Sequence, residues 1–313
     1  MTLEYLARRL LEVFVSALVV AVAIFIVLRL LPGDPAVMIL GGYATPESIA
    51  MVRRDLGTDR PIWEQFAEYM KGLARGNLGM SYRTGRPVAK EIASVYFHTL
   101  VLSVVALFVS VVFGIMAGVA AARRRDTWVD RSVMILSTTG VSVPAFTLSI
   151  VLLMVFGVRL KWFPIIGTGT YSDASFIRHL VLPSLTLGLT GAAALSRMTR
   201  ATLLDVLSED FIRTARSKGL SENIVAYKHA LRACLPPIIT IIGMRFGQLL
   251  GGTVIVETVF TRPGLGKLLV DAMWQRDYIQ VQGCVLILAL AFLGINLVTD
   301  LFYAFSDPRI QFK

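Results

Sequence analysis

The sequence predicts an all-α, polytopic membrane protein with six transmembrane helices. Hydrophobic residues make up 55% of the 313 positions and charged residues only 17%, whereas soluble domains carry about 25% charged residues. The net charge of +10 lies at the ends of apolar runs instead of in one patch, which favours membrane lipid as a partner and argues against nucleic acid. Six apolar runs approach the ~20 helical residues that cross a bilayer: 10–31, 98–122, 133–157, 179–196, 235–260 and 281–305.

Two of these runs need separate justification. The run 10–31 follows Arg8 and Arg9, as in a signal peptide, but no small-residue cleavage site follows it, so we expect an uncleaved anchor. The run 179–196 is the least apolar, because Pro183 and Gly188 interrupt it and hydroxyl residues dilute it. We retain this run as a span, because the number of transmembrane spans would be odd without it.

The loops between the runs predict the orientation of the chain. Six spans place both termini on one side, and the short loops on that side hold more than twice as many Lys and Arg residues as the short loops opposite. This bias predicts cytoplasmic termini. Segment 32–97 would then lie outside, because loops longer than about 60 residues are translocated largely regardless of charge.

Segment 32–97 also contains a candidate amphipathic helix. Its apolar residues recur at helical spacing, at Trp63, Phe66, Met70 and Leu73. Such a helix would lie on the membrane surface or cap the bundle. The alternative is an ordinary structured loop without a contact role.

The loop 197–234 is too long and too regular to be a simple turn. Ser208 is expected to cap a first helix, Gly219 to end it in the left-handed conformation, and Ser221 to cap a second helix. The second helix would carry one apolar stripe, formed by Ile224, Tyr227, Leu231 and Leu235. The tight bend at 215–221 suits insertion into a groove of another protein. Basic helices that touch only lipid headgroups are the alternative.

Several distinctive motifs occur along the chain. One is E-D-F-I-R-T-A-R-S-K-G-L from Glu209 to Leu220, with K-H-A-L-R from Lys228 and then Pro236. A second is G-G-T-V-I-V-E-T-V-F-T-R-P-G-L-G-K-L-L-V from Gly251 to Val270, followed by Arg276 and Asp277. Shorter motifs are L-P-G-D-P from Leu31, G-N-L-G-M-S from Gly76, V-P-A-F from Val143 and D-P-R-I from Asp307. Together they resemble one family, the permease subunits of ABC importers in the dipeptide, oligopeptide, nickel and glutathione branch, in which the first motif resembles the coupling loop and the second the hallmark of the branch. The resemblance spans essentially the whole chain.

Within this branch, the chain most resembles the glutathione and peptide permeases with a long outer loop after the first span. It departs from the wider importer pattern of E-A-A followed by Gly, because Arg213 and Thr214 stand at the first two positions and only Ala215 and Gly219 agree. Peptide-type permeases share this variation, which favours the branch and removes an expected Glu contact to the ATPase.

The resemblance implies a type I ABC importer permease fold in a single transmembrane domain over 1–313, in a bacterial inner (plasma) membrane. It implies a homologous second permease subunit, two cytoplasmic ATPase subunits and a periplasmic or lipid-anchored solute-binding protein as partners. Dipeptides, oligopeptides or glutathione would pass from periplasm to cytoplasm by alternating access.

The chain itself is not expected to hydrolyse ATP or to carry a cofactor. Its Gly266-Lys267 pair is followed by Leu268, and Thr261 stands where a phosphate-binding loop needs its first glycine. ATP and Mg²⁺ would be bound by the partner ATPases. The resemblance places the ATPase contacts at Arg213, Ala215, Arg216, Lys218, Gly219 and Leu220, where small residues allow close approach, cations give polar contacts and the leucine is an apolar anchor.

Glycines at four-residue spacing within two runs predict close helix packing. They are Gly114 and Gly118 in the second run, and Gly243, Gly247 and Gly251 in the fifth. Subunit pairing or a moving wall of the substrate pathway is the alternative, with Arg245, Gly247 and Gly251 as the pathway candidates.

Three charged residues in or near the apolar runs are candidates for a role in binding. Arg245 lies about ten residues into a run, so it should face the protein interior, a partner or water. It would pair with a substrate carboxylate or with a buried acid such as Asp300. Glu257 and Asp277 lie near the outer ends of runs and are expected to contact the binding protein.

Other classes of protein fit less well. His98, His179 and His229 form no H-E-x-x-H motif and there is no G-x-S-x-G, so an enzyme is not expected. Cys234 and Cys284 offer neither a disulfide framework nor a metal cluster. A stand-alone secondary transporter or channel is the alternative on hydropathy alone, but it has no use for a docking loop, and inverted repeats are not apparent.

Overall fold

The computed structural model describes residues 3–30, 34–41, 44–169 and 174–306, and the regular elements in these ranges are helices. An isolated antiparallel bridge joins Met80 and Pro87. Five helices are long and apolar enough to cross a membrane, or up to six if a bent pair counts as one span. The five are α1 (Leu3–Leu30), α5 (Val88–Arg123), α8 (Ala174–Leu207), α12 (Leu235–Val259) and α14 (Tyr278–Ser306). The all-α class is confirmed, and the count of six depends on the bent pair.

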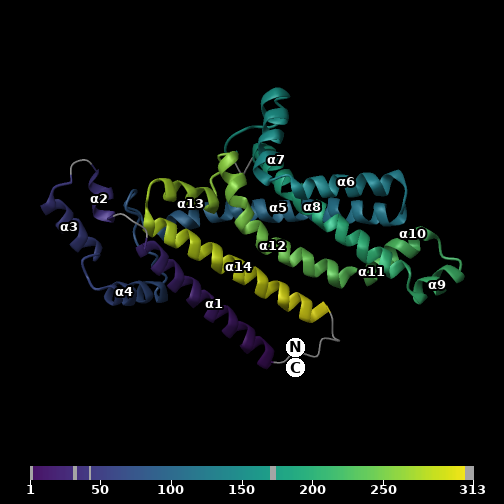
Figure 1. Cartoon of the computed structure of the whole chain (residues 1–313), viewed down its shortest axis with the longest axis horizontal. Coiled ribbons are helices and arrows are strands. Elements are labelled where there is room, and N and C mark those ends of the chain that lie inside the picture. The colour runs from purple at the N-terminus through teal and green to yellow at the C-terminus, as the bar shows by residue number, and fades with distance from the viewer. Residues whose placement is uncertain (1–2, 31–33, 42–43, 170–173, 307–313) are drawn as a thin grey trace.

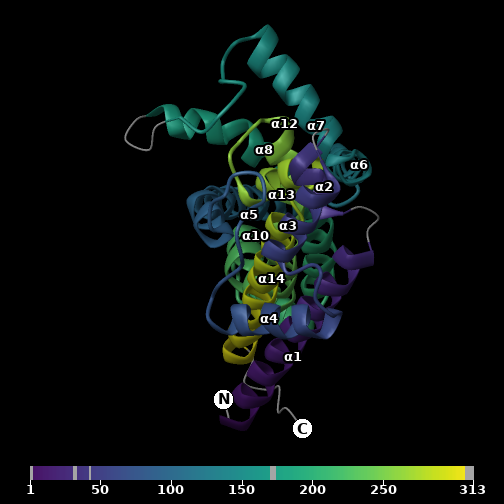
Figure 2. The same ribbon diagram turned by 90° about the vertical axis from the view of Figure 1, so that its left-hand side faces the viewer.

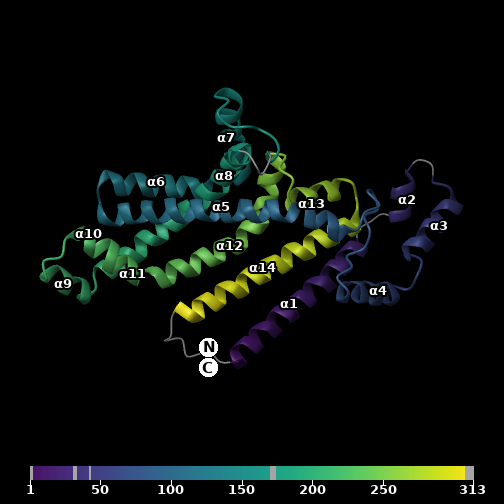
Figure 3. The ribbon, with the colours of Figure 1, turned by 180° about the vertical axis from the view of Figure 1, so that it is seen from behind.

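The long helices form an elongated bundle (Figure 1). The most extensive contact joins α5 and α8, while α14 packs on α12 and α1 packs on α14. Figure 3 shows the same order from behind, with α1 and α14 at one edge of the bundle and α5 and α6 at the other. Helices α2 (Pro35–Leu40), α3 (Pro46–Leu56) and α4 (Ile62–Ala74) lie at one end of the bundle, and α9 to α11 lie at the opposite end.

The third apolar run is not the continuous span that was predicted. It divides into α6 (Trp128–Ser142), α7 (Ala145–Leu152) and the π-helix η2 (Leu153–Arg159), with a bend of 105° at the break. Pro144 is the cause, because proline has no backbone N–H and holds the preceding Val143 in an extended conformation, at φ −78° and ψ 121°. Helix α7 therefore projects away from the bundle (Figure 2).

The fourth run is confirmed as a helix, and its weak hydropathy has a structural reason. In α8, 67% of the most apolar 18-residue window is buried inside the protein, compared with 11% in α1. A helix that faces protein instead of lipid does not need an apolar surface all round. Around Pro183, the hydroxyls of Ser184 and Thr186 are satisfied inside the helix, because they donate to the carbonyls of Leu180 (2.7 Å) and Leu182 (3.0 Å).

The predicted packing role of the glycines in α5 is confirmed. A Cβ atom at Gly114 would lie 2.8 Å from the Cβ of Leu195, and one at Gly118 would lie 2.6 Å from the carbonyl oxygen of Ser196. The contact is reciprocal, since glycines of α8 also meet α5 closely. These are Gly188, against Val109, and Gly191, against Ser110.

The amphipathic helix predicted in segment 32–97 is α4. Its Phe66 and Tyr69 rings lie 5.1 Å and 5.5 Å from the ring of Phe25 in α1, between ring centres. The guanidinium of Arg29 lies 3.8 Å from the centre of the same Phe25 ring. Helix α4 thus packs on the end of α1, whereas Trp63, expected on the same face, is exposed.

The α5–α8 contact predicts the effect of one added methyl group. Gly118→Ala should lower the stability of the purified protein by about 1–3 kcal/mol, because Ser196 leaves no room for a Cβ atom. Thermal unfolding in detergent measures the change. Gly251→Ala is the control, because its Cβ would have no atom within 4 Å. Equal unfolding temperatures for the two variants would contradict the packing argument.

Candidate functional site

The segment that connects α8 to α12 has the predicted form of helix, glycine bend, helix. We call residues 208–234 the coupling segment. It contains α9 (Asp210–Ser217), α10 (Glu222–Ile224), the π-helix η3 (Val225–Ala230) and α11 (Leu231–Ala233). Gly219 lies between α9 and α10 in the left-handed conformation, at φ 78°. The coupling segment begins eleven residues later than the predicted loop 197–234, because α8 continues to Leu207.

The predicted caps of these helices are only partly correct. Ser208 does not cap α9: its hydroxyl donates to the carbonyl of Asp205 (2.7 Å) and closes the last turn of α8. Glu209 holds the N-cap position of α9, and Ser221 that of α10, and neither side chain makes a capping hydrogen bond.

The predicted apolar stripe of the second helix is only partly correct. Leu231 is partly buried and packs against the interior as predicted, but Ile224, Tyr227 and Leu235 are exposed. The buried positions are Val225, Ala226, Ala230, Cys234 and Ile238. The π-helical turn of η3 forms hydrogen bonds between residues five apart, so a pattern read with a 3.6-residue period loses its register there.

An apolar cluster attaches the coupling segment to the bundle. It joins Ile212 and Ala215 of α9 to residues of η3, α5 and α8, including Val225, Val119 and Leu203. Leu220 packs against the same cluster. Ala215 and Leu220, which the sequence suggested as contacts to a partner, therefore face the interior of this chain and fix the position of α9.

The charged residues of the coupling segment divide into two groups. Arg216 is engaged within the chain: its Nε and Nη2 donate to the carboxylate of Glu222 at 2.8 Å and 3.3 Å, across the Gly219 bend. The hydrogen bond from Arg216 lowers the pKa of Glu222 below its ordinary value. Arg213 forms only a solvent-exposed pair with Asp210 (3.3 Å), and Lys218 is exposed. Phe211 of α9 is an exposed aromatic residue that the sequence analysis did not single out.

Glu257 is buried inside the chain at the end of the bundle opposite the coupling segment. Its carboxylate accepts hydrogen bonds from Thr99 Oγ1 (2.7 Å) and from the backbone N–H groups of Gly266 (2.8 Å) and Lys267 (3.1 Å). The two N–H groups belong to the first turn of α13 (Leu265–Trp274), and a helix N-terminus favours an anion. We call this arrangement the Glu257 clasp. A Cβ at Gly264 would lie 2.2 Å from the Glu257 carboxyl carbon, which explains this glycine of the hallmark run.

Asp277 is also buried and has partners within the chain. Its carboxylate accepts from the Ser81 hydroxyl (2.5 Å) and from the backbone N–H groups of Arg83 (3.3 Å) and Gln280 (3.1 Å). It caps the start of α14 and holds the turn at 80–87. Glu257 and Asp277, which the sequence suggested as contacts to a binding protein, therefore use their carboxylates inside the fold of this chain.

The residues suggested for a substrate pathway do not form one cluster. Arg245 Nη1 donates to Gln248 Oε1 (3.3 Å), and Asp300 pairs instead with Arg9 (2.6 Å), so the expected alternative of an Arg245–Asp300 pair is wrong. Gly247 is a packing residue, because its Cβ would lie 3.0 Å from the Phe292 ring. A Cβ at Gly251 would have no neighbour within 4 Å.

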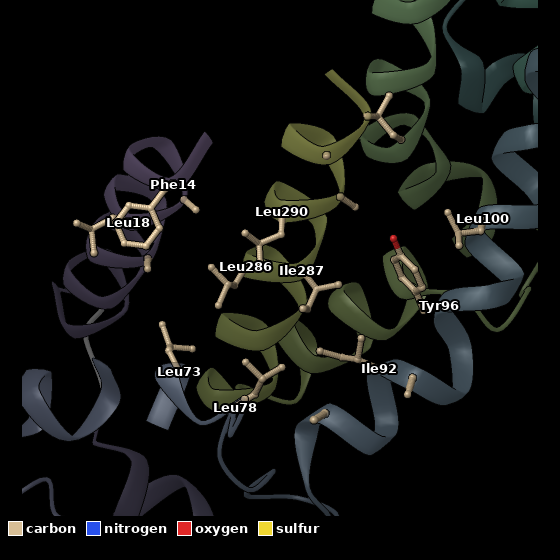
Figure 4. A pocket seen from close by; sticks show the side chains of 18 of the residues that line it. Phe14, Leu18, Leu73, Leu78, Ile92, Tyr96, Leu100, Leu286, Ile287 and Leu290 are labelled. Atoms are coloured by element: carbon tan, nitrogen blue, oxygen red, sulfur yellow. The ribbon is translucent and has the colours of Figure 1, made fainter. Parts of the chain in front are cut away.

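A large apolar groove lies between α1, α4, α5 and α14 (Figure 4). Its volume is about 1280 Å³. In Figure 4, Phe14 and Leu18 of α1 lie on one side of it and Tyr96 of α5 on the other, with Leu286 and Leu290 of α14 between them. The lining residues in the described part of the chain are uncharged, so we do not assign the groove to a substrate with charged ends.

Long apolar helices around one tightly packed pair, with a bent helical segment at one end, are the architecture of a multi-pass membrane protein. The chain belongs to the family described as binding-protein-dependent transport system inner membrane component, whose profile matches residues 110–312. The profile of the N-terminal part of such membrane components matches residues 2–103. The chain is thus a multi-pass membrane permease.

Curated relatives match along their whole length. The glutathione transport system permease protein GsiC of Escherichia coli K12 is 44% identical over 311 residues, which is 99% of this chain and 100% of the relative. The protein of the same name from Salmonella choleraesuis is 45% identical over the same shares.

Solved structures support the fold. The MetNI methionine ABC transporter, in an inward-facing conformation, aligns with a TM-score of 0.60 over 69% of this chain and 96% of that chain, at 18% identity. An amino acid ABC transporter with bound histidines aligns with a TM-score of 0.53 over 68% and 93%, at 16% identity.

The Glu257 clasp predicts a large stability effect from one buried carboxylate. Glu257→Ala should cost at least about 3 kcal/mol, because it leaves the donors on Thr99, Gly266 and Lys267 without an acceptor. Chemical or thermal unfolding in detergent measures this. Asp271→Ala on the same helix removes only the part-exposed pair with Lys267 and should cost less than about 1 kcal/mol. If both variants lost the same stability, the clasp would have no special role.

Proposed function

We propose that this chain is one of two permease subunits of an ATP-driven importer that takes up glutathione or related short peptides. The observation that carries the proposal is the coupling segment, a compact bent element that packs firmly on the bundle and still exposes Phe211, Arg213 and Lys218. Full-length similarity to glutathione permeases supports the substrate class.

The proposed partners are those that a permease without a phosphate-binding loop of its own needs, and the exposed residues of α9 offer one of them a docking surface. ATP and Mg²⁺ are bound by two cytoplasmic ATPase subunits, which contact α9 around Gly219. Aromatic residues and arginine are enriched at protein interfaces, so the exposed Phe211 and Arg213 support docking at this place. A homologous second permease completes the pathway, and a periplasmic or lipid-anchored binding protein delivers the solute. In this proposal the domain extends over 1–313 as one unit, because α5 begins within segment 32–97 and its last residue, Arg123, contacts the coupling segment.

Arg245 is the residue we propose for a substrate carboxylate. A guanidinium carries five donor hydrogens. One of those on Arg245 is directed to Gln248. An arginine within an apolar helix is costly unless it serves a polar partner or water. A peptide or glutathione carboxylate is such a partner, and Gly251, about two turns from Gly243 on the same helix, leaves open space there.

The orientation can be tested with introduced cysteines. Cys234 and Cys284 are buried, and burial raises the pKa of Cys234 to about 11, so neither should react with a maleimide in the folded protein. Glu47→Cys should react with a membrane-impermeant maleimide in intact spheroplasts, whereas Ser217→Cys should react only after the membrane is opened. Both positions are exposed. The reverse pattern would overturn the proposal of cytoplasmic termini.

Transport can be tested with the complete importer. Partners that co-purify with the tagged chain would be identified by mass spectrometry, and the complex reconstituted in liposomes with its binding protein. Labelled glutathione should accumulate only with ATP, while liposomes that contain this chain alone should accumulate none. ATP-dependent uptake of dipeptides without glutathione would correct the substrate alone. Uptake by the isolated chain without ATP would favour a stand-alone carrier.

A further inference from the structure

Arg123, the last residue of α5, contacts the coupling segment from a position about a hundred residues earlier in the chain. Its Nη2 donates to Oδ1 of Asn223, which lies in α10. Its guanidinium carbon lies 5.3 Å from the centre of the Tyr227 ring in η3, within the range of a cation–π contact. One side chain therefore holds two elements of the coupling segment.

The contact continues inward as apolar packing. Val119 and Ala122, directly before Arg123, belong to the same buried cluster as Ile212 of α9 and Ala230 of η3. Arg123 thus forms the polar rim of an interface whose apolar base already joins α5 to the coupling segment. The interface contains side chains from both helical halves of that segment.

The same helix reaches the opposite end of the bundle without a break. Helix α5 has 36 residues, and Thr99 in its first half donates to the carboxylate of the Glu257 clasp at 2.7 Å. About 36 Å of continuous helix separate Thr99 from Arg123. A regular helix of this length transmits a displacement of one end to the other.

We propose that Arg123 is the positioning residue that makes α5 move together with the coupling segment, so that a displacement imposed on α9 reaches the Glu257 clasp. The proposal rests on the proposed function, in which partner ATPases supply that displacement. Two places in the coupling segment would otherwise absorb it: Gly219, which is exposed and left-handed, and the π-helical turn of η3. Arginine suits this role because its planar group can donate to an amide while it stacks on a ring, whereas lysine has no planar group.

The decisive variant is Arg123→Gln, with Arg124→Gln as a matched control at the adjacent exposed position. Both would be assembled into the complete importer in liposomes, and solute moved would be divided by ATP hydrolysed. Arg123→Gln should keep the wild-type yield, ATPase co-purification and basal hydrolysis, while the ratio falls at least ten-fold. Arg123→Lys should restore part of the ratio, and Arg124→Gln should match the wild type. A wild-type ratio in Arg123→Gln, or a parallel loss of yield, hydrolysis and uptake, would overturn the proposal.

A second variant covers the case in which Arg123→Gln fails to fold. Asn223 is exposed, so Asn223→Ala removes only the acceptor of the Arg123 hydrogen bond. It should lower the ratio in the same direction by a smaller factor, and the double variant should be no worse than Arg123→Gln alone. A wild-type ratio in Asn223→Ala would overturn the proposal.

A readout that needs no substrate separates this inference from the proposed function. Hydrogen exchange would be measured with the ATPases trapped by vanadate. In the wild type, protection should change both in the coupling segment and around Thr99, and in Arg123→Gln only in the coupling segment. If ATPases bind but glutathione is not moved, only the substrate assignment fails. If Thr99 responds equally in both proteins, only the role of Arg123 fails, and if no ATPase binds, both proposals fail.

Discussion

The close contact between α5 and α8 is the constraint on which the rest of the bundle depends. Lipid gives helices no hydrophobic reason to associate, so association depends on close van der Waals contact and on hydrogen bonds between helices. Glycines on both helices supply the close contact, and the Ser110 hydroxyl adds a hydrogen bond to the carbonyl of Gly188 (2.8 Å). Helix α6 is then held to α8 by two polar contacts, the Asp130–Arg200 ion pair (2.5 Å) and the hydrogen bond between the Ser137 and Ser196 hydroxyls (2.6 Å). The helices that carry the ends of the bundle are thereby placed relative to one central pair.

Both ends of the bundle use polar contacts to α5, a buried one at Glu257 and an exposed one at Arg123. At one end, the Glu257 carboxylate joins α12, α13 and Thr99, and at the other, Arg123 joins α5 to the coupling segment. The buried contact is specific in geometry, because an unpaired carboxylate or N–H group in a dry interior is costly. A few residues can therefore fix how the two ends are oriented, while the surface between the two ends remains apolar.

Much of the fold could be predicted from the sequence, because exposure to lipid selects the long apolar runs that hydropathy detects. The same rule nearly missed α8, whose polar face is covered by protein, and it did not reveal the break at Pro144, since a proline can also lie inside a span, as Pro183 does. In the candidate site, Gly219 was found from local signals alone. The partners of Glu257 and Asp277 were not, because Thr99 and Ser81 lie 158 and 196 positions away and no local pattern connects them.

The contrast in burial between α8 and α1 has a consequence for how the sequence can change over evolutionary time. Two thirds of the central window of α8 meets protein, so each replacement there must match a neighbour in shape, whereas α1, with 11% buried, meets mostly the surroundings of the bundle. Along α1, apolar residues of different shape can substitute for one another with little cost, except where Phe25 and Arg29 hold α4 and Arg9 holds Asp300. Divergent homologues should therefore keep most residues of α8 unchanged. In α1 they should preserve the apolar character and only a few individual residues.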